Sequence, residues 1–111
     1  MSNTKIIYPY FEHYELQLKS PMGWIKVKAT LTFESADSFC GEAKLMGITA
    51  VLTDCQKNGS SYRFKASPKL PFGVLDVTID ADIHEDGSVS GTANAPLHKP
   101  MEIKGKRVMN A

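Results

Sequence analysis

The sequence predicts an all-β fold, an eight-stranded antiparallel up-and-down β-barrel, and three observations support this prediction. Apolar and polar residues alternate over long stretches, the gaps between these stretches are short, and no stretch repeats its apolar residues at helical spacing. Strict alternation is typical of strands with one buried face, and short gaps join antiparallel neighbours. Such a meander can bury its apolar face by closing into a barrel, and a two-layer β-sandwich is the alternative.

The strands follow from this alternation in chain order. Residues 25–34 and 75–84 show it most clearly, with apolar residues at the odd-numbered positions and polar or charged residues at the even-numbered ones. The other strands show the same pattern more weakly. The predicted strands are 13–19, 24–34, 38–45, 48–55, 61–67, 73–84, 88–95 and 101–108.

A single domain is expected, because a chain of 111 residues suffices for one hydrophobic core and not for two. Residues 13–108 form the predicted barrel. Residues 1–12 are an aromatic-rich arm, or a plug over the end at which the first strand begins. Residues 109–111 form a short tail.

The turns between the predicted strands fall into two classes. Those at 35–38, 57–60 and 85–88 are polar, and the last two contain the Asn-Gly and Asp-Gly pairs that suit tight hairpins. The other four turns are rich in proline, methionine and further apolar residues. Because successive turns of a meander lie at opposite ends, one end of the barrel is expected to be polar and the other apolar. The apolar rim comprises Met22, Trp24, Met46, Leu70, Phe72 and Leu97.

Charge and hydropathy limit the expected partners and location. The chain has 13 basic and 12 acidic residues and a formal net charge of +1, which gives no reason to expect nucleic acid or an anionic membrane as a partner. No apolar run reaches the roughly 18 to 20 residues of a membrane span. The first residues lack the apolar stretch of a secretory signal, so a cytoplasmic location is expected.

The interior of the predicted barrel contains many alanines and glycines. A barrel of eight strands is either filled by side chains or holds one small ligand. The small residues favour a cavity, whereas Phe33, Tyr62 and Phe64 are large enough to fill the space. The residues expected to contact an apolar ligand, at the rim and inside, are Met22, Trp24, Met46, Tyr62, Phe64, Phe72, Leu97 and Met101.

Catalytic motifs are missing from the sequence, which contains no nucleophile elbow, phosphate loop or dinucleotide-binding fingerprint. Residues that meet only in space still allow a cofactorless cyclase or isomerase, in which a polar side chain polarises the substrate. The first suspects for such a site are Tyr14, Tyr62 and His98.

Candidate metal ligands form one row, Asp80-x-Asp82-x-His84, on a single predicted strand face. This row is more typical of a solvated strand than of a metal site, because three neighbouring ligands on an extended strand rarely converge on one ion. Neither a metal nor any other cofactor is therefore predicted.

The two cysteines, Cys40 and Cys55, occupy outward positions on adjacent predicted strands. A turn centred on residues 46–47 places them diagonally rather than opposite each other. Diagonal Cβ atoms are usually too far apart for a disulfide, so two free thiols are expected.

Several glycine-rich motifs resemble those of a known group of proteins. The turns 21–23 and 71–73, the strand 87–93 and the closing segment 105–107 are similar to motifs of small bacterial calycin-like β-barrel domains, which share the architecture of lipocalins and streptavidin. The resemblance covers most of residues 14–108. It implies a domain that occurs alone or attached to flavin-dependent oxidoreductases.

The resemblance also implies a role for one residue. Calycins place an arginine at the end of the last strand, where it caps one end of the barrel, and Arg107 matches that position. The usual partner is a tryptophan in a Gly-x-Trp motif on the first strand. This sequence lacks that motif, and Trp24 begins the second strand instead.

Three functions from different classes are compatible with these observations. The leading hypothesis is a non-catalytic binding module that takes a small apolar ligand into the barrel through the apolar rim. The second is an accessory module with a filled barrel that docks onto a partner protein, such as a flavin-dependent oxidoreductase. The third is a cofactorless barrel enzyme. A homodimer formed through the apolar end or an exposed strand face is compatible with each.

Overall fold

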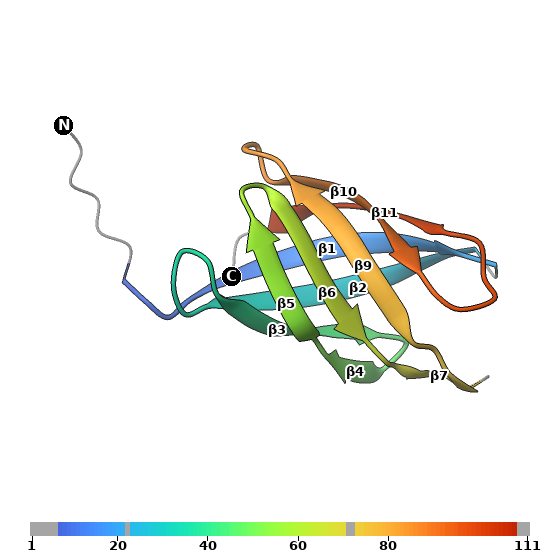
Figure 1. Cartoon of the computed structure of the whole chain (residues 1–111). Helices are drawn as coiled ribbons and strands as arrows, with labels where there is room; N and C mark the ends of the chain where they lie inside the picture. Colours follow the sequence, from blue (N-terminus) through green and yellow to red (C-terminus); the bar gives the residue numbers. More distant parts are fainter. Residues whose placement is uncertain (1–6, 22, 71–72, 109–111) are drawn as a thin grey trace.

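The fold is an antiparallel sheet of nine strands that curls into a nearly closed barrel, as Figure 1 shows. The computed structural model describes residues 7–21, 23–70 and 73–108. Within these ranges no helix is long and apolar enough to cross a membrane. The strands of the sheet are β1 (Tyr10–Ser20), β2 (Gly23–Phe33), β3 (Phe39–Leu45), β4 (Ile48–Val51), β5 (Thr53–Asn58), β6 (Ser61–Ala66), β9 (Val77–Ile83), β10 (Ser88–Asn94) and β11 (Met101–Val108).

The order of the strands in the sheet is that of a meander. It runs β4-β3-β2-β1-β11-β10-β9-β6-β5, so the first and last strands of the chain lie side by side. In this pairing Tyr14 lies opposite Arg107 and Leu18 opposite Ile103. All the remaining neighbours in the sheet follow each other directly in the chain, except β6 and β9, between which a small ribbon is inserted.

A single bent stretch of chain brings the two sides of the sheet together. The strands β4 and β5 are separated only by Leu52, yet β4 pairs with β3 and β5 pairs with β6. The backbone N–H of Leu52 donates a hydrogen bond of 2.9 Å to the carbonyl oxygen of Gly41 on β3. The predicted strand 48–55 is therefore real but bent, and it continues to Asn58.

The bend contains a β-bulge, which corrects the prediction for one cysteine. The pairing of β5 with β6 changes register between Thr53 and Gln56, and Asp54 has a φ of 50°. An extra residue in a strand reverses which side chains face inward beyond it. Cys55 is therefore partly buried and packs against the core instead of pointing outward, whereas Cys40 is exposed as expected.

Two further boundaries differ from the sequence prediction. The predicted strand 73–84 is divided, because β8 (Gly73–Val74) pairs with β7 (Lys69–Leu70) in a separate two-stranded ribbon before β9 begins. At the other terminus, β1 begins at Tyr10 and pairs with β2 from there. Residues 10–12, which were expected in the N-terminal arm, thus belong to the sheet.

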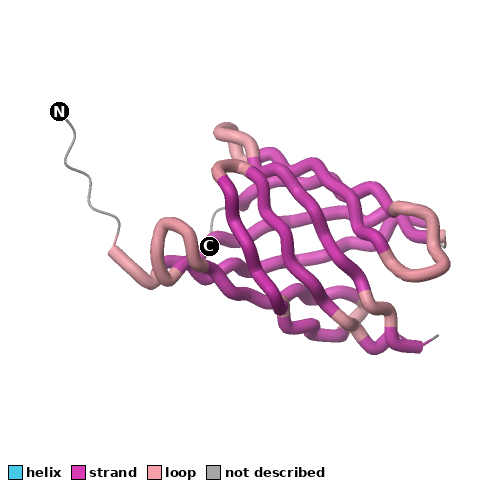
Figure 2. The backbone as a smooth tube through the Cα atoms, viewed as in Figure 1, coloured by secondary structure: helices cyan, strands magenta, loops and turns pink. Residues whose placement is uncertain are grey.

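The turns gather at two opposite ends of the barrel, as Figure 2 shows. One end, here called the base, carries the turns after β2, β5 and β9, together with the start of β1 and the end of β11. The other end, here called the mouth, carries the turns after β1, β3 and β10 and the ribbon of β7 and β8. This arrangement follows from the meander.

Three inward glycines allow neighbouring strands to approach closely. A Cβ atom at Gly41, Gly91 or Gly105 would collide with a backbone carbonyl oxygen of the adjacent strand. At Gly105 that oxygen belongs to Glu15, and the Cα of Leu16 would lie only 2.8 Å away. These glycines were expected to leave room inside the barrel, but their role is to bring strands together where the sheet is strongly curved.

Replacing Gly105 with alanine should therefore destabilise the protein. The added Cβ meets backbone that cannot move without shifting β1, so we expect a loss of about 2 kcal/mol or more in the free energy of unfolding. Urea denaturation measures this loss. Thr92→Ala, at an exposed position on the neighbouring strand β10, is the control and should cost less than about 1 kcal/mol. Equal losses for the two variants would show that Gly105 has no special steric role.

Candidate ligand cavity

The barrel surrounds a cavity of about 300 Å³. This volume is at the lower end of the range for small-molecule sites. Every strand of the nine-stranded sheet except β5 contributes to the lining, which is almost wholly apolar. Six alanines on the inner face leave this space open, namely Ala29, Ala43, Ala50, Ala66, Ala81 and Ala93.

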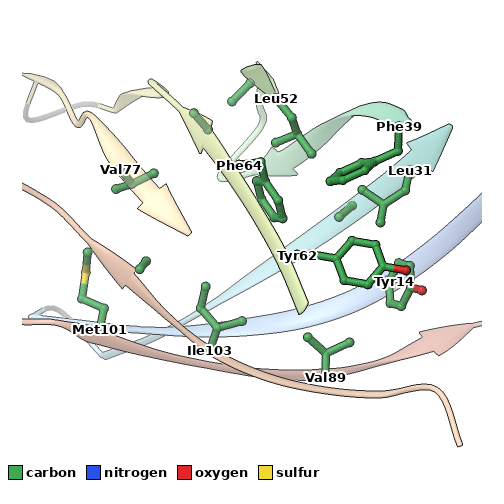
Figure 3. Close-up of a cluster of buried hydrophobic side chains, with 14 of the residues drawn as sticks. Tyr14, Leu31, Phe39, Leu52, Tyr62, Phe64, Val77, Val89, Met101 and Ile103 are labelled. Atoms are coloured by element: carbon green, nitrogen blue, oxygen red, sulfur yellow. The ribbon is translucent and has the colours of Figure 1, made fainter. Parts of the chain in front are cut away.

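Large aromatic side chains close the base. The rings of Tyr10 and Phe33 are stacked with their centroids 4.9 Å apart. Phe39 lies 5.8 Å from Phe33 and 5.4 Å from Tyr62, in tilted and edge-on arrangements that aromatic rings favour. The bulk expected to fill the interior is thus concentrated at one end. Figure 3 shows Tyr14 and Tyr62 at one end of the buried cluster and Val77 and Met101 at the other.

A charged network lies beside this aromatic cluster. The hydroxyl of Tyr14 donates a hydrogen bond of 2.8 Å to Glu12, and the guanidinium of Arg107 contacts the other carboxylate oxygen of Glu12 at 3.3 Å. The backbone N–H of Arg107 donates to the carbonyl oxygen of Gly87 at 2.8 Å. Arg107 therefore joins the ends of β1 and β11 to the turn between β9 and β10.

The sequence prediction overlooked Glu12, although a signal for it was present. Glu12 has the same parity as Tyr14, Leu16 and Leu18 and is therefore directed toward the inner side of β1. A carboxylate at such a position requires a partner. The basic residue able to supply one is Arg107, which lies opposite Tyr14 in the neighbouring strand.

The two tyrosines that line the cavity near the base stay protonated well above neutral pH. Burial raises the pKa of Tyr62 to about 12, and the negative charge of Glu12 adds to the effect. Burial also raises the pKa of Tyr14, and the hydrogen bond to Glu12 acts in the same direction. Near neutral pH both side chains are therefore neutral phenols, and the hydroxyl of Tyr14 is already occupied by Glu12.

The cavity reaches the surface at the mouth. Pro21 and His98 are exposed, and both contribute to its lining. Ser20 and Gln17, near the end of β1, are the other polar residues of the lining at this end. Leu75 and Pro68, which flank the β7–β8 ribbon, line it as well. The cavity is thus closed at the aromatic base and accessible between the turns that the sequence marks as apolar.

The residues predicted to contact a ligand divide into three groups. Tyr62, Phe64 and Met101 line the cavity, as do two of the catalytic suspects, Tyr14 and His98. Met46 and Leu97 are exposed at turns of the mouth and are not among the lining residues. Met22 and Phe72 lie outside what the structure describes, as does the side chain of Leu70, which was predicted for the rim.

Trp24 lies near the start of β2, at the mouth, and is not among the residues that line the cavity. Its position in β2 has outward parity, and its ring packs on the outer surface of the barrel between two lysines. The Nζ of Lys104 lies 4.5 Å from the centre of the ring and that of Lys19 lies 5.9 Å from it. These cation–π contacts hold the indole away from the cavity.

The acidic row on β9 is engaged by neighbouring side chains. Asp80 forms an ion pair of 2.6 Å with Arg63, and Asp82 accepts a hydrogen bond of 2.9 Å from Ser61. The imidazole of His84 lies 3.1 Å from the hydroxyl of Ser90. Across residues 7–21, 23–70 and 73–108, no three histidine, cysteine, aspartate or glutamate side chains gather into a metal-binding group.

Comparison with known proteins adds no family to this description. No model of a known protein family matches the chain, and no curated protein matches it.

The raised pKa of Tyr62 predicts a loss of stability in alkali. An unfolded tyrosine ionises near pH 10, whereas Tyr62 in the folded protein keeps its proton to about 12. Its contribution is therefore complete below pH 10 and is lost as the pH rises towards 12, because only the unfolded chain gains from ionisation. Urea unfolding at a series of alkaline pH values should show a smaller loss for Tyr62→Phe. An equally steep loss in the variant would mean that Tyr62 ionises normally.

Proposed function

We propose that this protein is a binding module of calycin-like architecture that takes a small apolar molecule into the barrel through the mouth. The observation that carries the proposal is a cavity of about 300 Å³ with an apolar lining, closed at the base and accessible at the mouth. A module that only docks onto a partner needs no such space. The position of Arg107 at the end of the last strand, tied to β1 through Glu12, supports the calycin-like architecture.

The form of the cavity narrows the class of ligand. The lining offers few polar groups, so the buried part of the ligand would be hydrocarbon or aromatic. At the base, Tyr14 is already bonded to Glu12. At the mouth, the exposed side chain of His98 lines the cavity near solvent. A ligand with one polar group would therefore place that group at the mouth and its apolar part towards the base.

The first test is native mass spectrometry of freshly purified protein. A small molecule that travels with the folded protein and is released on denaturation would identify the compound class. Binding of the neutral apolar dye N-phenylnaphthylamine, followed by its fluorescence, is the second test, and we expect binding to the wild-type protein. If no small molecule copurifies and the dye does not bind, the proposal is contradicted.

Filling the cavity should reduce this binding. Ala93 is 1% exposed, lines the cavity, and lies between Ile79 and Met101 of the neighbouring strands. Ala93→Leu should weaken dye binding about tenfold or more, because the added carbon atoms occupy the ligand's space. Since that space is empty, the variant should lose less than the roughly 1–3 kcal/mol of an overpacked core.

The control for this variant is Thr92→Leu, which adds apolar bulk at an exposed position one residue away. It should leave dye binding unchanged. Equal weakening by the two substitutions would place the dye on the outer surface. A large loss of stability in Ala93→Leu with unchanged dye binding would show that the interior is filled.

A further inference from the structure

The charges of the protein are segregated, although the formal net charge is only +1. Six exposed lysines occupy the outer surface of β1, β2, β3 and β11, and we call this surface the lysine face. The residues of the lysine face are Lys19, Lys26, Lys28, Lys44, Lys104 and Lys106. The same surface carries three glutamates, which leaves it positive. The glutamates are Glu15, Glu42 and Glu102.

The register of the strands brings these lysines together. Lys26 and Lys104 are the cross-strand partners of Gln17, on its two sides. One step closer to the base, Lys28 and Lys106 flank Glu15 in the same way, and Lys44 lies opposite Lys28. Like charges directly opposite each other destabilise a sheet, so the pair of Lys28 and Lys44 has a cost to the folded protein.

The lysine face differs from the opposite side of the barrel. There, two basic side chains are paired with carboxylates, Arg63 with Asp80 at 2.6 Å and Lys65 with Asp54 at 3.5 Å, and Lys57 lies over the ring of Tyr62. None of the six lysines is within ion-pair distance of a carboxylate in the part of the chain that the structure describes. Their charge is therefore available to an external anion.

Apolar side chains project into solvent where the lysine face meets the mouth. Trp24 is 45% exposed between Lys19 and Lys104. In the turns of the mouth, Met46 is 47% exposed and Leu97 is fully exposed. Both have left-handed backbone, with φ of 51° and 64°, which side-chain-bearing residues adopt reluctantly. Glycine occupies the other left-handed positions at both ends, so at Met46 and Leu97 the mouth holds apolar side chains at a cost to folding.

We propose that the mouth and the adjoining lysine face dock onto an anionic lipid bilayer. The exposed apolar side chains enter the interfacial region while the lysines contact the anionic headgroups. Tryptophan is favoured at the level of the headgroups, and lysines near an anionic surface each strengthen attachment. The inference does not depend on the proposed ligand. It would give that ligand a source in the bilayer, because His98, the neighbour of Leu97, lines the cavity at its opening.

A bilayer accounts for these features better than a nucleic acid does. Single-stranded nucleic acid is held by aromatic side chains that stack on successive bases within a basic groove. Here Trp24 is the one exposed aromatic side chain that the structure describes at the mouth, and Leu97 and Met46 are aliphatic side chains at separate turns. Apolar tips surrounded by lysines are the composition of interfacial membrane-binding surfaces.

Trp24 provides a direct test, because it is the single tryptophan of the chain. Its emission should shift to shorter wavelength when vesicles of equimolar phosphatidylglycerol and phosphatidylcholine are added, since the indole leaves water. The protein should also sediment with these vesicles, and high salt should release it. Vesicles of phosphatidylcholine alone should bind it weakly. Equal binding to both vesicles, or to neither, would overturn the proposal.

Charge reversal distinguishes the contribution of the lysine face to vesicle binding from the contribution of the net charge. Lys19→Glu combined with Lys104→Glu should lower binding to anionic vesicles about a hundredfold, measured by sedimentation. The control is Arg63→Glu combined with Lys65→Glu, which makes the same change in net charge on the opposite side and should retain most of the binding. Thermal unfolding followed by circular dichroism confirms that both proteins are folded. Equal loss in the two proteins would refute the role of the lysine face.

Leu97→Ser should weaken vesicle binding and reduce the shift of the Trp24 emission. Val51→Ser is its control, because Val51 is also an exposed apolar residue, at 66%, but lies on β4.

Ala93→Leu should bind vesicles normally, so a failure of the ligand proposal is distinguishable from a failure of docking. Binding of a single-stranded oligonucleotide without binding of vesicles would contradict the proposal and assign the lysine face to nucleic acid.

Discussion

The bend between β4 and β5 is the constraint on which the rest of this barrel depends. The terminal strands of the sheet are β4 and β5, and only Leu52 separates them, so the bend holds the two edges of the sheet together. Free sheet edges are prone to associate with other chains. The hydrogen bond from Leu52 to Gly41 and the bulge at Asp54 turn one stretch of chain from one partner strand to another. The circumference that results is small, which determines how much space the inner face leaves.

Within that circumference, the two ends of the barrel have different physical characters. The base combines stacked aromatic rings with the Glu12 network, which joins the first strand, the last strand and a turn. Neither feature occurs among the described residues of the mouth, where the turn residues Met46 and Leu97 are exposed. Between the two ends, small inward residues leave the cavity open from the aromatic base to the mouth. This polarity follows from where the large residues fall along each strand.

The sequence was sufficient for most of the fold, since alternation and short turns predict the meander and its two ends. It was insufficient for the bend, because a bulge interrupts alternation without leaving a pattern of its own, and Cys55 was consequently assigned to the wrong face. The division of the predicted strand 73–84 was missed for a related reason. The alternation continues through residues 75 and 76, although they belong to neither β8 nor β9.

The candidate site was harder to predict than the fold. Alternation identified the inward alanines, but whether they leave a cavity depends on Phe33 and Phe39 packing together at the base, and that contact joins two strands. Trp24 was expected to contact the ligand because it follows an apolar turn, although its parity in the strand points outward. Packing against Lys19 and Lys104 makes that outward position favourable. Net charge likewise concealed the lysine face, because segregation becomes visible only when strand register is known.

The pairing of β1 with β11 has a consequence for how this barrel could be rewired. Because His13 lies opposite Val108, the beginning of the first strand and the end of the last are neighbours at the base. A short linker between them would leave every strand pair intact, so the chain is suited to circular permutation, with new termini opened at the exposed turn of Gly59. A protein fused near the start of β1 or the end of β11 would also be attached at the base and would leave the mouth unobstructed.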